Sequence, residues 1–253
     1  MRRLSLLLVL SLLLSSAALA DPLVQLPDLT GAAYWPEGTD ETTAAYVYRY
    51  TYPQVEGDGQ TETTINVYYS NEVDYALAFD VPIRGEELRI PGLQSSTDIR
   101  YQIMVNDDMF FTVLVVADSV MDGERHVKVS AQNFSRDTEK PGNVMTLAYL
   151  LDILEDSEEN DWLRSRQTNR ASTVARDLVW AQIEERREEG EVFPEDWDRE
   201  MLDYEFFPEE DFYCDVEEGL LVFFFQPYLN GPDMEPDSYY TFPLDIEDIL
   251  DEM

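Results

Sequence analysis

Hydrophobic and polar positions alternate along several stretches of the chain, and this period of two predicts strands. In residues 45–52 every second residue is a tyrosine, which is typical of a strand, and the run ends at Pro53. Three further extended runs cover 98–105, 110–117 and 125–134. The connections between these three runs are short and carry turn-forming residues, so the sequence predicts an antiparallel meander there.

Apolar residues spaced three and four apart predict the helices. Residues 62–79 are ambiguous, because β-branched residues favour a strand while the apolar spacing favours an amphipathic helix, which we expect. A short helix is predicted over 146–154 and a long one over 161–189, where Gly190 is a stop signal. A last short helix is expected over 245–251.

The most apolar part of the chain is a predicted hairpin of 212–216 with 220–226. Its second run has no alternation, which predicts a central strand covered on both faces. Together these elements predict an α+β fold, an antiparallel sheet with helices packed on one face. We expect one unit over 44–253, whose halves 44–140 and 141–253 share the sheet.

The N-terminal residues carry the three-part pattern of a secretory signal peptide. A positively charged start precedes an apolar run over 4–14 and an Ala-x-Ala step at 18–20, which predicts cleavage after residue 20. The alternative is an uncleaved anchor, but the run is shorter than the roughly 20 residues that span a bilayer. We therefore expect a protein secreted to the cell-wall side, with no membrane span after cleavage. Residues 21–43, rich in Pro, Gly and Thr, are expected to be a flexible lead-in or an edge segment.

Charge narrows the choice of partners. The 253 residues include 53 acidic and 17 basic side chains, a net charge of −36. Such a surface repels phosphate backbones and anionic lipid, so nucleic acid is not an expected partner. One cysteine and one histidine exclude a disulfide framework and a Cys/His zinc site, and we expect no metal and no cofactor.

Few residues suggest reactive chemistry. His126 and Cys214 are the only candidates for a thiol–imidazole pair, and a buried structural cysteine is the expected state of the second. Acidic residues are too numerous for a catalytic pair to be recognised. Tyr239 and Tyr240 lie in loop-like contexts and are candidates for an exposed contact surface. We therefore expect a protein that is not an enzyme.

Several segments resemble, in their order and spacing, the RsiV family. This extracellular domain is shared by bacterial anti-sigma-V factors and the N-terminal part of the peptidoglycan deacetylase PdaC. The similar segments are Tyr52-Pro53-Gln54-Val55-Glu56-Gly57, Gly123 with His126, Asn133-Phe134 with Met145-Thr146-Leu147, Phe212-Tyr213, Leu221-Val222-Phe223-Phe224-Phe225-Gln226-Pro227-Tyr228 and Phe242-Pro243-Leu244. The chain departs from the family pattern at Glu124 and Arg125 and in the loop 229–236.

The resemblance implies an extracellular sensing or binding part on its own, since a cytoplasmic segment, a membrane helix and a deacetylase domain are not expected here. In the anti-sigma members that part recognises lysozyme, a basic protein. We expect a non-catalytic binding module for lysozyme-like basic proteins or cell-envelope components such as peptidoglycan. Its ligand-binding candidates are His126, Tyr228, Tyr239 and Tyr240. The alternative is an extracellular hydrolase acting on peptidoglycan or glycans.

Overall fold

The structure is a computed structural model that describes residues 21–151, 153, 161–215, 220–229 and 238–253. The predicted signal peptide, the turn of the predicted hairpin and most of the loop that follows Tyr228 lie outside the described residues. Within the described part of the chain, no helix is both long and apolar enough to cross a membrane.

The first half of the chain forms a five-stranded sheet with the strand order β1-β2-β3-β4-β5. The strands are β1 (Leu29–Trp35), β2 (Tyr46–Tyr52), β3 (Ser95–Asn106), β4 (Phe110–Met121) and β5 (Glu124–Ser135). Strands β3, β4 and β5 pair antiparallel in sequence order, so the predicted meander is confirmed. Part of the predicted lead-in is β1, an edge strand paired antiparallel with β2, rather than a flexible tether.

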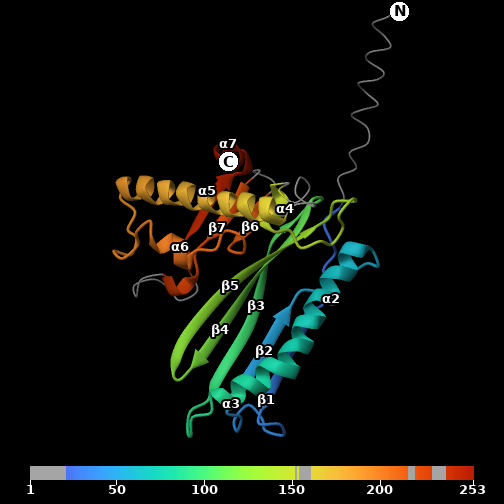
Figure 1. The fold of residues 1–253 in the computed structure, drawn as a ribbon. Helices are drawn as coiled ribbons and strands as arrows, with labels where there is room; N and C mark the ends of the chain where they lie inside the picture. The colour runs from blue at the N-terminus through green and yellow to red at the C-terminus, as the bar shows by residue number, and fades with distance from the viewer. Residues whose placement is uncertain (1–20, 152, 154–160, 216–219, 230–237) are drawn as a thin grey trace, which may run out of the picture.

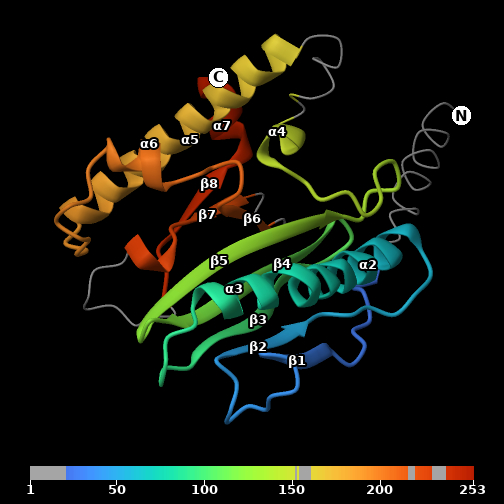
Figure 2. The ribbon, with the colours of Figure 1, turned by 60° about the horizontal axis from the view of Figure 1, so that its bottom comes forward.

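The sheet is mixed, because β2 and β3 run parallel. Between them the chain crosses one face of the sheet as α2 (Gln60–Tyr75), the π-helical turn η1 (Ala76–Asp80) and α3 (Val81–Glu87). A helical crossover returns the chain to the same end of the sheet, and the next strand is therefore parallel to the last. The helix predicted over 62–79 is confirmed, and the strand alternative is wrong. Figure 2 shows α2 and α3 lying along the sheet.

The second half of the chain contains its own sheet of order β6-β7-β8, made of β6 (Phe212–Asp215), β7 (Leu220–Phe224) and β8 (Thr241–Asp245). As predicted, β7 is the central strand, and four of its five residues are buried. The expectation that both halves share one sheet is wrong. The strands form two separate sheets, and at the outer edge of β5 the backbone of Val129 bonds to the side chain of Gln226 rather than to a strand of the second sheet.

Helices pack around the small sheet. They are α4 (Leu147–Leu150), α5 (Asp161–Glu188), α6 (Met201–Glu205) and α7 (Ile246–Glu252), while the 3-10 turn η2 (Pro227–Leu229) lies next to β5 of the large sheet. Figure 1 shows α5 running over the small sheet, at the opposite end of the molecule from α3. The long and the terminal helices were predicted, while α4 is shorter than the expected 146–154.

Each half has its own hydrophobic core. One core lies between α2 and the large sheet, and the other lies between the small sheet and α5. A smaller cluster centred on Leu114, Val129 and Phe224 joins the two sheets on the face that α2 leaves free. The α+β class is thus confirmed, with α2 and α3 on one face of the large sheet and the small sheet on the other.

Candidate functional site

A cleft of about 770 Å³ opens beside α2 and α3, over the part of the large sheet that these helices leave uncovered. Its floor is formed by residues of β2 to β5, and one wall by α2 and the η1–α3 turn. The opposite rim comes from the second half of the chain, at 207–211 and 226–228. Both halves therefore contribute to one depression, which is the usual setting for a ligand site.

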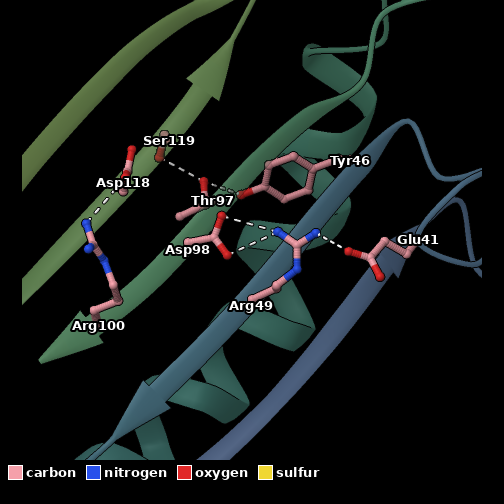
Figure 3. Close-up of polar contacts among 8 residues, drawn as sticks. All are labelled: Glu41, Tyr46, Arg49, Thr97, Asp98, Arg100, Asp118 and Ser119. Atoms are coloured by element: carbon pink, nitrogen blue, oxygen red, sulfur yellow. Dashed lines mark hydrogen bonds and ion pairs between the residues drawn. The ribbon is translucent and has the colours of Figure 1, made fainter.

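Hydroxyl groups lie at the bottom of this cleft. The Tyr46 hydroxyl donates to Thr97 Oγ1 at 2.8 Å, and Thr97 Oγ1 lies 2.8 Å from Ser119 Oγ (Figure 3). The three residues are 1 %, 4 % and 5 % exposed, so the chain of hydroxyls is almost entirely buried. Thr97 and Ser119 are cross-strand partners on β3 and β4, which fixes their distance.

A polar row on β5 continues the floor towards the open side. The side chains of His126, Lys128, Ser130 and Gln132 are spaced two apart and therefore lie on the same face of the sheet. His126 and Lys128 are exposed, whereas Ser130 and Gln132 are half-buried. The Tyr69 hydroxyl of α2 donates to Gln132 Oε1 at 3.3 Å, which connects the helix wall with this row.

Asp211 and Gln226 form the far rim. Gln226 Nε2 donates to Asp211 Oδ1 at 2.7 Å, and the Phe207 backbone N–H donates to Asp211 Oδ2 at 2.9 Å. Asp211 is only 5 % exposed, and burial raises the pKa of its carboxyl in spite of these two donors. Next to it, Tyr228 is exposed and donates from its hydroxyl to Glu205 Oε2 at 3.2 Å.

The helix wall adds both charges and rings. Glu72, Asp80 and Arg84 line the cleft, and burial, together with the nearby Asp80, raises the pKa of the Glu72 carboxyl. Burial also raises the pKa of Tyr68 to about 12. This phenol therefore stays protonated at neutral pH, so it can both donate and accept a hydrogen bond.

The structure brings two of the four expected ligand-binding residues together. His126 and Tyr228 both line the cleft, from the floor and from the far rim. Tyr239 instead packs against Phe224 between the two sheets, with ring centroids 6.0 Å apart. Tyr240 donates its hydroxyl to the Val192 carbonyl, away from the cleft.

Cys214 is buried, as expected, and its N–H donates to Asn133. Burial raises the pKa of its thiol to about 12, so the sulfur is a poor nucleophile at neutral pH. Within the described ranges, no group of three or more His, Cys, Asp or Glu side chains is arranged to hold a metal ion.

Other lining residues were not expected from the sequence. They include Tyr68 and Glu72 on α2 and Lys128 and Gln132 on β5. The alternating polar residues of 125–134 were visible, but such a row ordinarily marks a solvent-facing side of a strand. Only the packing of α2 and the second half of the chain beside it turns this row into the floor of a cleft.

No protein-family model and no curated protein sequence matches the chain. Two solved structures are similar in fold. A DUF3298 family protein from Pseudomonas aeruginosa PAO1 has a TM-score of 0.53 at 11 % identity, and the match covers 91 % of this chain and 94 % of that one. A member of the same family from Bacteroides fragilis has a TM-score of 0.49 at 11 % identity, with 91 % of each chain covered. At this identity the first similarity shows the fold alone.

Proposed function

We propose that this chain is a secreted, non-catalytic binding module, and that its cleft takes a glycan fragment of the cell envelope such as a piece of peptidoglycan. The observation that carries the proposal is the composition of the cleft. Tyrosine rings stand beside hydroxyl, amide, carboxylate and ammonium groups over about 770 Å³. A saccharide presents apolar C–H faces and a rim of hydroxyls, so it can use both kinds of group at once.

The sequence resemblance to the RsiV extracellular domain supports binding without chemistry. In that family the domain senses a partner outside the cell, and two of its motif positions, His126 and Tyr228, line the cleft here. The signal-peptide pattern supports export to the compartment in which wall fragments are found.

The test is calorimetric titration of the protein with a chitin tetrasaccharide and with a soluble muropeptide. We expect Lys128→Ala and Tyr228→Ala each to weaken binding by about tenfold, since each removes a contact inside the cleft. Matched controls are Lys140→Ala and Tyr204→Ala, whose side chains do not line it. Equal affinity in all four variants, or no heat with either probe, would refute the proposal.

A basic protein such as lysozyme is the second partner class. It is favoured by the net charge of −36, because an acidic surface attracts a cationic protein over a screening length of about 8 Å at physiological ionic strength. Binding of lysozyme measured at low and at physiological salt would test this class. Absence of a complex at both salt concentrations removes it.

A hydrolase acting on peptidoglycan or glycans is the alternative function. Glu72 and Asp211 both line the cleft with a raised carboxyl pKa, a property that catalytic acids share. Release of sugar or acetate from wall material, lost on Glu72→Gln, would establish this function. It would also refute the non-catalytic proposal.

A further inference from the structure

An apolar stripe runs along the outer side of the helical crossover. Tyr75, Phe79 and Ile83 are 59 %, 53 % and 53 % exposed, although each is a large hydrophobic residue. They follow one another at intervals of four residues along the crossover, and the rings of Tyr75 and Phe79 lie 5.1 Å apart. We call these three exposed residues the ridge. None of the three lines the cleft.

Acidic side chains follow one another along the same crossover. Residues 72–87 contain five carboxylates and one basic residue, Arg84; of these, Glu72, Asp80 and Arg84 line the cleft, and the other three carboxylates do not. Asp74, Glu86 and Glu87 are exposed. A surface helix ordinarily turns its apolar side to the core, and α2 does so with Ile65, Tyr69 and Val73. The exposed ridge is therefore a second apolar side, with no core to cover it among the described residues.

We infer that this ridge docks a cationic amphipathic helix of a partner. The apolar side of such a helix would cover Tyr75, Phe79 and Ile83, and its lysines or arginines would face the exposed carboxylates. The ridge covers the nine residues from Tyr75 to Ile83, which is at most about 12 Å at the α-helical rise of 1.5 Å per step and is close to two turns of a partner helix. A second copy of this chain fits poorly, because two surfaces with the same acidic residues repel each other.

This docking face is separate from the cleft and goes beyond the proposed function. A failure here leaves the saccharide titration untouched, and the reverse is also true. The two surfaces share the crossover helices, but they use different sides of them.

The test uses a fluorescent peptide of about 18 residues, made of leucine and lysine with all leucines on one helical face. We expect it to bind the protein, and Phe79→Ser and Ile83→Ser each to weaken the complex by about tenfold. Val192→Ser, at a residue that is 83 % exposed and lies far along the chain from the ridge, should leave the affinity unchanged. All three positions are more than half exposed, and circular dichroism confirms that each variant is folded.

Two control peptides separate the parts of the inference. A scrambled peptide of equal charge should bind at least tenfold more weakly, since its leucines no longer share a face. A peptide with glutamine in place of lysine should also bind more weakly, because it loses the attraction of the carboxylates.

Equal binding of the scrambled or the glutamine peptide overturns the inference. So does unchanged binding in Phe79→Ser and Ile83→Ser. A dimer in sedimentation that is lost in Phe79→Ser would assign the ridge to a second copy, and vesicles of anionic lipid that bind through it would assign it to a membrane. Either result overturns the inference as stated.

Discussion

Primary-amide side chains act as substitutes for a neighbouring strand at three places. In each case one side-chain oxygen accepts from a backbone N–H, and the nitrogen of the same amide donates to the carbonyl of that same residue, at 2.7–3.0 Å. The pairs are Asn66 with Val55, Asn106 with Leu23 and Gln226 with Val129. Such two-point contacts satisfy backbone groups that no strand reaches.

The Gln226 contact is the most buried of the three, and we predict that Gln226→Leu destabilises the protein. Leucine leaves the Val129 backbone groups and Asp211 without this partner, at a cost of about 3 kcal/mol. Urea unfolding measures the change. Gln182→Leu is the control, because its amide makes a single exposed bond to the Pro243 carbonyl, and it should cost less than about 1 kcal/mol. Equal losses of unfolding free energy in the two variants would show that the buried Gln226 contact stabilises the protein no more than an exposed hydrogen bond does.

The contact between Asp118 and Arg125 allows a prediction of how the free energy of unfolding changes in acid. Arg125 donates to both of its carboxylate oxygens at 2.7 and 2.8 Å, and this contact lowers the pKa of Asp118 below its usual value of 3.8. The stabilisation is therefore complete above the unfolded pKa and is lost as the pH falls through the lower, folded pKa.

We expect the unfolding free energy of Asp118→Asn to fall less than that of the unmodified protein between about pH 5 and about pH 2. Chemical denaturation at several pH values measures this slope. Asp58→Asn, at an exposed position before α2, is the control. An acid slope in Asp118→Asn as steep as that of the unmodified protein would contradict the assignment.

At the scale of elements, α3 packs against β1 and β2, and its approach to β1 is very close at one residue. Gly85 lies directly against the Trp35 side chain, and a Cβ at this position would overlap its Cβ, Cγ and Cδ1 atoms. Glycine ordinarily weakens a helix by about 1 kcal/mol relative to alanine. Here the absence of a side chain is what lets the helix pack on the edge strand and form the wall of the cleft.

Gly85→Ala should therefore destabilise the protein by about 1–3 kcal/mol, because the added methyl group overpacks the contact. Thermal and urea unfolding measure the effect. In a background of Trp35→Ala the ring is gone, and the same substitution should become neutral or stabilising by up to about 1 kcal/mol. If Gly85→Ala stabilises the protein that keeps Trp35, the contact does not constrain the helix.

For the whole molecule, the large negative net charge determines how the stability of the fold responds to salt. A net charge of −36 on 253 residues makes the folded state repel itself, and dissolved salt screens this repulsion. We expect the unfolding free energy to rise on the order of 1 kcal/mol between about 20 mM and about 500 mM NaCl. Urea titrations at both concentrations test it, and potassium chloride, which screens charge equally at equal concentration, should give the same rise. A fall in stability with salt would mean that attractive ion pairs outweigh the repulsion.

The local pattern of the sequence was enough to predict most elements. Tyrosine alternation located β2, the meander followed from turn chemistry, and the unbroken apolar run identified β7 as a central strand. Long-range pairing was beyond this pattern. The two sheets meet at β5, where the side chain of Gln226 bonds to the backbone of Val129. Nothing in the sequence around a glutamine indicates which distant backbone its side chain will contact.

The candidate site was predicted only in part, for a similar reason. His126 and Tyr228 were selected, and both line the cleft, but Tyr239 and Tyr240 lie outside it. Their loop-like sequence context suggested exposure, whereas Tyr239 packs between the two sheets. The site is shared by residues 46–132 of the first half and residues 207–228 of the second, so it depends on how the halves pack, and no local period in the sequence records that.

The division into two contiguous cores has a consequence for the order of assembly during synthesis. All residues of the core between α2 and the large sheet lie before residue 136. The large sheet and its helical crossover can therefore fold while later residues are still inside the ribosome. Until Asp211 and Gln226 emerge, however, the outer edge of β5 at Val129 and the surface around Leu114 lack the partners that cover them in the folded protein. The nascent chain thus passes through an intermediate with exposed apolar surface. A variant truncated after the first core should therefore aggregate under conditions in which the whole chain stays in solution.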